Sequence, residues 1–168
     1  MDSFARRVTE QIPHLRRYAM ALVGNRVHAD DLVQDCLERA LSRSHLWQDG
    51  NLRGWLFTIM HNIHANTRRR AARSPLIAAL DNEEISAVAP PTQEEGLAVA
   101  GLAAALATLP DEQRSVVLLV GLEEFSYAET AEVLGVPIGT VMSRLHRGRE
   151  RLRQVLANDA SPALRRVK

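Results

Sequence analysis

Six side chains that can bind nucleic acid recur at helical spacing in the middle of the chain: Trp55, Thr58, Asn62, Asn66, Arg69 and Arg73. This spacing places them on one narrow stripe of a helix. An aromatic ring can stack on a base, an amide can read a base edge, and an arginine can pair with a phosphate. The stripe therefore predicts a surface for a single strand. Trp55 by itself also fits a core anchor, and the arginine run at 68–70 also fits a solvated helix end.

A second polar set follows a predicted helix-turn-helix near the C-terminus. Ser126 and Glu129 have the spacing of a capping box, Gly135 stands where a left-handed residue ends a helix, and Pro137 precedes the next helix. We expect the apolar side of that next helix to face inward: Ile138, Val141, Leu145, Leu152 and Leu156. The other side presents hydroxyls and arginines: Thr140, Ser143, Arg144, Arg147 and Arg151. Such a helix fits the major groove of DNA, and the alternative is a surface helix with a solvated arginine face.

A third face is acidic. A helix expected at 28–43 has an apolar stripe made of Leu32, Val33, Cys36, Leu37, Ala40 and Leu41. Asp31, Asp35 and Glu38 lie on the opposite side. An acidic face suits a basic protein partner better than DNA. Acids in a first helical turn also complement the helix dipole, which explains Asp31 but not Glu38.

The elements that must position these faces are all helical. Low aromatic content and abundant Ala, Leu, Arg and Glu favour helices over sheets. Apolar periodicity predicts helices at about 3–23, 28–43, 54–73, 97–109, 112–122 and 127–134, and a last one ending near 156. Pro13 is expected to kink or divide the first of them. We predict an all-α chain of two small helical domains, the second a helix-turn-helix.

Charge divides the 168 residues into three parts, although the formal net charge is only +1. Residues 1–80 have 12 basic and 7 acidic residues, residues 81–113 have 7 acidic and no basic residues, and residues 114–168 have 9 basic and 6 acidic residues. Two basic modules joined by an acidic, flexible linker fit a polyanionic partner. The expected division is a first domain at 1–74, a linker at 75–95, a second domain at 96–158 and a tail at 159–168.

Other classes find little support. The single cysteine, Cys36, excludes an internal disulfide and is expected in the core. No apolar run is long enough for a membrane span or a signal peptide, so the expected location is the cytoplasm. His61 and His64 stand three residues apart with no third ligand in a recognisable motif, and both are expected to be partly exposed. We therefore expect no metal, no cofactor and no enzymatic activity.

Four segments share a pattern with a known family. Residues 30–35 read Asp-Asp-Leu-Val-Gln-Asp, 52–59 read Leu-Arg-Gly-Trp-Leu-Phe-Thr-Ile, and 109–114 read Leu-Pro-Asp-Glu-Gln-Arg. The fourth segment is the helix-turn-helix at 126–147. In this order the segments resemble the bacterial extracytoplasmic function (ECF) sigma factors, over about residues 5–157. Met142 departs from the family pattern, which commonly has a lysine or arginine there, and this puts a phosphate contact at 142 in doubt. The sequence of residues 51–59 is similar to that of the general-stress-response group of these factors.

The resemblance implies a dissociable subunit that binds core RNA polymerase and directs promoter-specific transcription initiation, in a stress response. The residues implied to bind the clamp of the largest polymerase subunit are Asp31, Leu32, Gln34, Asp35 and Glu38. The residues implied to bind the minus-ten element, together with the 44–53 loop, are Trp55, Asn62, Asn66, Arg69 and Arg73. The outer face of the last helix, with Thr140, Ser143, Arg144, Arg147 and Arg151, is implied to read the minus-thirty-five element.

Further partners are implied by the same resemblance: the polymerase flap region, promoter DNA, and an anti-sigma factor that holds both domains. The competing interpretation is a helix-turn-helix repressor or activator whose first 80 residues form an effector or dimerisation domain. That interpretation needs a ligand pocket or a symmetric interface, and the sequence shows neither. An enzyme built on His61 and His64 is the least favoured class.

Overall fold

The fold is entirely helical across the part of the chain that the structure describes. This structure is a computed structural model that describes residues 3–74 and 93–164, with side chains for 3–74 and 96–159. The first half contains α1 (Ser3–Val23), α2 (Arg26–Ser42), the short 3-10 helix η1 (Ser44–Leu46) and α3 (Leu52–Arg73). The second half contains α5 (Gln93–Ala107), α6 (Asp111–Gly121), α7 (Tyr127–Leu134) and α8 (Ile138–Leu164). The prediction of an all-α chain of two helical domains is confirmed.

Two asparagines explain why α2 and α3 each begin two residues before the predicted start. The side chain of Asn25 accepts a hydrogen bond from the His28 backbone at 3.1 Å, and Asn51 accepts one from Gly54 at 3.0 Å. Both are N-caps, which satisfy donors that the first helical turn leaves unpaired. Position 54 must be small because an added Cβ would lie 2.7 Å from the Asn51 side chain.

Helix α1 runs unbroken through Pro13. Proline lacks the N–H that would bond to the carbonyl of Thr9. Pro13 is exposed, so solvent can satisfy that carbonyl. The buried residues of α1 continue on both sides of the proline, from Val8 to Leu15 and Tyr18. Packing of this apolar side therefore outweighs the local loss at Pro13.

The helix-turn-helix forms as its sequence predicts. The Glu129 backbone donates to Ser126 Oγ at 3.0 Å, and the Ser126 backbone donates to the Glu129 carboxylate at 2.8 Å. Gly135 ends α7 with φ of 64°, the left-handed conformation that glycine adopts without a Cβ penalty. Val141 and Leu145 are buried as expected.

The prediction that the apolar side of α8 faces inward is wrong at the two ends of that side. Ile138 is 50% exposed and Leu156 is also exposed. A helical projection gives the side of a residue but not how far the neighbouring helices extend along it. Helix α8 also continues to Leu164, past the expected end near residue 156 and through much of the expected tail. The predicted linker at 75–95 lies outside the described residues, except that α5 already begins at Gln93.

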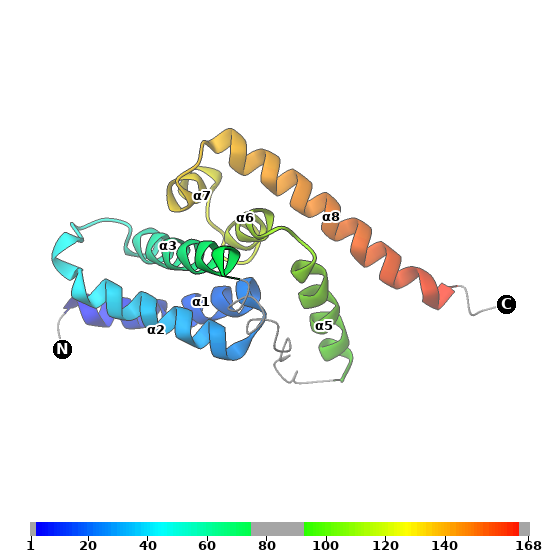
Figure 1. Ribbon diagram of the computed structural model, residues 1–168, viewed down its shortest axis with the longest axis horizontal. Coiled ribbons are helices and arrows are strands. Elements are labelled where there is room, and N and C mark those ends of the chain that lie inside the picture. Colours follow the sequence, from blue (N-terminus) through cyan, green and yellow to red (C-terminus); the bar gives the residue numbers. More distant parts are fainter. Residues whose placement is uncertain (1–2, 75–92, 165–168) are drawn as a thin grey trace.

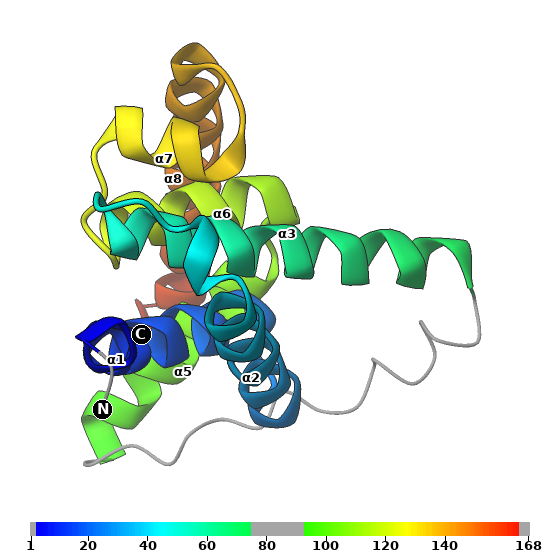
Figure 2. The ribbon, with the colours of Figure 1, turned by 90° about the vertical axis from the view of Figure 1, so that its left-hand side faces the viewer.

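The two halves pack against each other through α3 with α7 and α1 with α6. Figure 1 shows α7 beside α3, and Figure 2 shows the last turns of α3 projecting beyond the rest of the molecule. The core is continuous across the contact, because the rings of Phe57 and Phe125 meet edge-on with centroids 5.1 Å apart. The sequence alone gave no indication of this contact.

None of the helices in the described ranges is long and apolar enough to cross a membrane.

Candidate nucleic-acid interface

The outer face of α8 is open to solvent over much of its length. Ser143, Arg147 and Arg151 are exposed, whereas Thr140 and Arg144 are half-buried. The Ser143 hydroxyl donates to the carbonyl of Thr140 at 3.1 Å, which fixes its direction. A capped helix-turn-helix with exposed arginines on its second helix can enter the major groove and contact base edges or phosphates.

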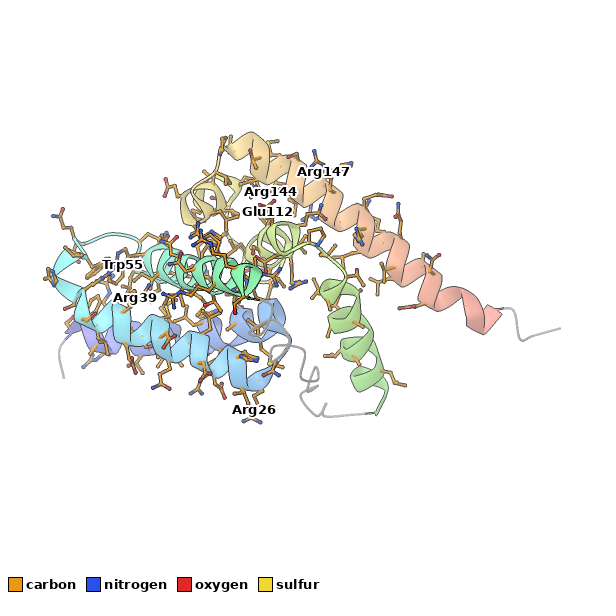
Figure 3. The ribbon with its side chains drawn as sticks, viewed as in Figure 1. Arg26, Arg39, Trp55, Glu112, Arg144 and Arg147 are labelled. Atoms are coloured by element: carbon orange, nitrogen blue, oxygen red, sulfur yellow. The ribbon has the colours of Figure 1, made fainter. Side chains whose placement is uncertain are left out.

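Arg144 is placed differently from Arg147. Its guanidinium lies 3.4 Å from the carboxylate of Glu112 on α6, and Figure 3 labels this pair and Arg147. Glu112 is largely exposed, so this ion pair is weak and can exchange for a phosphate. The structure thus brings all five predicted residues together on one helix, with Arg144 held toward its own domain.

The stripe on α3 divides into two parts. Asn62, Asn66, Arg69 and Arg73 are exposed, and the last three belong to the C-terminal turns of α3. Arg69 donates to the side-chain oxygen of Asn66, which couples a cation to an amide on adjacent turns. These four side chains form an accessible basic and amide surface of the kind that binds a strand.

Trp55 belongs to an aromatic cluster instead. It is half-buried, and its ring meets that of Phe4 edge-on with centroids 6.1 Å apart. Phe4 also contacts Trp47 at 5.4 Å, and the Arg7 guanidinium lies 4.5 Å above the Trp47 ring. The core-anchor interpretation thus describes much of Trp55, and a contact of its ring with a base stays a prediction. The sequence pattern did not predict that Trp47 and Arg7 belong to this cluster.

The acidic face of α2 is exposed at four of its five predicted positions: Asp31, Gln34, Asp35 and Glu38. Gln34 donates to Glu38 at 3.0 Å. Leu32 is the exception, because it is only 7% exposed and packs in the core, as its place on the apolar stripe predicts, and its part in a clamp contact stays a prediction. It lies on the same side of α2 as Cys36, one turn away, and that side faces α1 and α3.

Two aliphatic residues accompany this acidic face. Leu41 is 49% exposed, although we expected it in the core, and Val27 is also exposed. At 100° per residue Val27 falls within about 40° of both Asp31 and Glu38, and Leu41 falls about 60° from Glu38 and about 80° from Asp31. The helical projection that identified the acidic side would also have placed Val27 and Leu41 near it. The face therefore combines carboxylates with exposed apolar side chains, which is typical of a protein–protein contact.

The two expected partly exposed histidines differ. His61 is half-buried, but His64 is only 7% exposed, which corrects the prediction. Its Nε2 lies 2.7 Å from Oδ1 of Asp111 at the start of α6. Burial raises the pKa of the Asp111 carboxyl. The hydrogen bond from His64 and the charges of His64, Arg68 and Arg114 lower this pKa by a larger amount, so it lies below its ordinary value.

Cys36 lies in the core as predicted, with its side chain fully buried. Its Sγ donates to the carbonyl of Leu56 at 3.4 Å, and burial raises the pKa of the thiol to about 12. The thiolate is therefore scarce at neutral pH, and the residue acts as a small apolar group. Within the described ranges no three histidine, cysteine or acidic side chains are placed to hold a metal ion.

Comparison with known proteins agrees with this arrangement of two halves. Residues 8–61 match the family described as the Sigma2 domain of PhyR, and residues 100–152 match Sigma-70, region 4. A helical first half with one polar stripe and a second half with a DNA-reading helix-turn-helix define the class of two-domain transcription initiation factors.

Full-length relatives place the chain within that class. It is 36% identical over 162 residues to the ECF RNA polymerase sigma factor EcfG of Rhodopseudomonas palustris, covering 95% of this chain and 88% of that one. It is 35% identical over 165 residues to the ECF factor SigE of Mycolicibacterium smegmatis, covering 96% and 64%. The chain belongs to the ECF RNA polymerase sigma factors. It directs transcription initiation by RNA polymerase.

A solved structure shares the fold over nearly the whole chain. The sigma factor RpoE of Bartonella quintana, in complex with the anti-sigma factor NepR, superposes with a TM-score of 0.79 at 31% identity, covering 94% of this chain and 98% of that one. CnrH in complex with the cytosolic domain of CnrY shares the fold with a TM-score of 0.68 at 24% identity, covering 93% and 88%.

Proposed function

We propose that this sigma factor binds core RNA polymerase through the acidic face of α2 and reads the promoter with α3 and α8. The observation that carries the proposal is the separation of three polar faces on three helices, each with a different chemistry. One is acidic and apolar, one carries amides and arginines on a projecting helix, and one carries hydroxyls and arginines on a helix-turn-helix. A sigma factor needs these three contacts at the same time.

The polymerase contact uses Asp31, Gln34, Asp35 and Glu38 with the neighbouring Val27 and Leu41. The carboxylates select a basic partner surface and steer its approach. The two aliphatic side chains lose water when the surface is covered, which supplies affinity that exposed ion pairs alone do not give. The clamp of the largest polymerase subunit is the proposed partner of this face, and the flap region is the proposed partner of the C-terminal half.

The minus-ten contact uses Asn62, Asn66, Arg69 and Arg73, with the exposed edge of Trp55 and the neighbouring 44–53 loop. The amides read bases that have left the duplex, and the arginines hold the backbone. The minus-thirty-five contact uses Ser143, Arg147 and Arg151 directly, and Thr140 and Arg144 at the margin of the same face. The mechanism is binding and strand capture, and the chain performs no covalent chemistry.

Regulation and location follow from the partners. An anti-sigma factor is proposed because the RpoE relative of similar fold was solved with NepR. Its proposed mode is to hold the two halves together and cover the polymerase-binding face. The cytoplasm is the proposed site of action, because core RNA polymerase and promoter DNA are found there.

Run-off transcription with purified core polymerase tests the proposal. The core enzyme alone should give no discrete transcript from candidate promoters, and addition of the chain should give start-site-specific products. Deletion of the minus-ten or the minus-thirty-five element from the template should each reduce the product. A chain that only lowers transcription by a separate holoenzyme would instead be the repressor of the competing interpretation.

A further inference from the structure

The carboxylate of Glu123 in the turn between α6 and α7 is enclosed by the first half of the chain. Its side chain has no solvent exposure. Arg17 on α1 donates from Nε to Oε1 at 3.0 Å, and Arg53 on α3 donates from Nη2 to Oε2 at 2.7 Å. His14 on α1 lies with Nδ1 3.3 Å from the same Oε2. One buried acid of the second half thus meets three basic side chains of the first half.

The same arginines also hold the backbone of this turn. Arg53 donates to the Glu123 carbonyl at 2.6 Å, and Arg17 donates to the Leu122 carbonyl at 3.2 Å. Carbonyls at a helix C-terminus lack partners within the helix and favour cations. The contact therefore fixes the end of α6 as well as the carboxylate.

Aromatic rings form the floor of this contact. The Arg53 guanidinium lies 4.7 Å from the centre of the Phe125 ring and 5.8 Å from that of Phe57. These two rings pack edge-on against each other across the boundary between the halves. The Glu123 carboxylate has no solvent exposure, so its ion pairs are screened less than pairs between two surface side chains. A buried carboxylate that loses such partners is strongly unfavourable.

We propose that Glu123, with Arg17, Arg53 and His14, is an electrostatic latch that keeps the chain in a closed form, and that core polymerase binds the form in which this latch is open. The functional part of this statement rests on the proposed function.

Elements named minus-ten and minus-thirty-five lie about 25 base pairs apart, or about 85 Å at 3.4 Å per pair. A compact chain of this length has a radius of gyration of only about 15 Å.

The closed form therefore cannot bring α3 and α8 to both promoter elements. Contacts between α7 and α3 hold the helix-turn-helix beside the strand-binding helix. Any partner that binds only the open form must supply the free energy to break the latch, and weakening the latch makes that partner bind more tightly. The latch thereby sets how readily the free chain enters the holoenzyme.

Distance measurements between paired spin labels test the latch without polymerase or DNA. Labels at Glu10→Cys on α1 and Gln154→Cys on α8 report the separation of the halves, because both positions are exposed and the native Cys36 is buried and unreactive. Glu123→Gln removes the charge but keeps the shape. Glu124→Gln is the matched control, because Glu124 is adjacent, exposed and loses the same charge.

We expect Glu123→Gln to raise the ratio of long to short distances roughly tenfold or more, because its partners lose a buried counter-charge. Arg17→Ala should act in the same direction, and because the Arg17 side chain is 50% exposed, this variant keeps the test valid if Glu123→Gln fails to fold. Unchanged distances in both variants, or an equal shift in Glu124→Gln, would overturn the latch. Run-off transcription then separates the two proposals. An opened variant that supports transcription at lower concentration supports both. An opened variant without transcripts contradicts the proposed function, and with it the binding of polymerase to the open form, but it leaves the latch between the halves supported.

Discussion

The imidazole Nε2 of His64 on α3 lies 2.7 Å from the Oδ1 of Asp111 at the first turn of α6. This pair joins the two halves of the sigma factor at a point separate from Glu123. Asp111 also lies in the first turn of α6, where the helix dipole favours a negative charge. The pair therefore supports both the contact between the halves and the start of a helix.

Replacing His64 should destabilise the whole chain. In His64→Ala a partly buried carboxylate loses its hydrogen-bond donor, which costs about 1–3 kcal/mol. Urea unfolding followed by circular dichroism measures the free energy of unfolding. His45→Ala is the matched control because His45 is exposed, and it should change stability by less than about 0.5 kcal/mol. Equal losses in the two variants would contradict the structural role of the pair.

Acidification should weaken the fold through His61. Burial lowers the pKa of His61 below its ordinary value of 6.5, and the charge of His64 lowers it further. Below pH 6.5 the unfolded chain therefore binds more protons at this site than the folded chain, so the free energy of unfolding falls as the pH drops. Unfolding curves for the wild type and His61→Gln at pH 8 to 5 measure this. The wild type should lose more free energy of unfolding than His61→Gln as the pH falls to 5, so any advantage of the wild type should narrow or reverse. Parallel pH profiles of the free energy of unfolding would exclude a contribution from His61.

Arg147 should matter only where a minus-thirty-five element is present. Arg147→Ala is expected to weaken promoter use by about 1–3 kcal/mol if the guanidinium reads a base edge. Run-off assays on templates with and without that element measure the effect. Arg153→Ala is the control on the same helix, because Arg153 is paired with Glu150 at 2.9 Å. An equal loss for Arg147→Ala on both templates would refute a role in reading the element.

Asp35→Arg should impair association with core polymerase while the chain still folds. The substitution reverses a charge on the exposed acidic face, so it replaces attraction to a basic partner with repulsion. Co-purification with core polymerase measures association, and circular dichroism checks the fold. Glu10→Arg makes the same charge change at an exposed position of α1, outside every proposed binding surface, and should leave association intact. Undiminished binding by Asp35→Arg would count against this face.

The close packing of α6 on α8 should make Gly148 hard to replace. An added Cβ would lie 2.7 Å from Cγ2 of Val117, whose branched side chain has little freedom to move. Overpacking costs about 1–3 kcal/mol, and the higher helix propensity of alanine offsets at most about 1 kcal/mol of that loss. Thermal unfolding of Gly148→Ala should therefore show lower stability. Gly139→Ala on the same helix meets nothing within 4 Å and should be neutral or stabilising.

Local features of this chain could be predicted because a few neighbouring residues determine them. The capping box of Ser126 and Glu129 and the left-handed Gly135 are both observed. The predicted first residues of α2 and α3 were wrong for an equally local reason: Asn25 and Asn51 are N-caps that extend these helices by about half a turn. The role of each surface residue and the general-stress-response subgroup stay predictions.

The sequence by itself determined the helices, their order, the family and the three polar faces, because helical periodicity and capping depend on residues a few positions apart. Only the tertiary structure decided that His64 is buried and that Glu123 is enclosed by Arg17 and Arg53. Those residues are 106 and 70 positions from Glu123 along the chain. Nothing in the local pattern of either half specifies such a contact, which arises when two apolar surfaces pack and bring distant charges together.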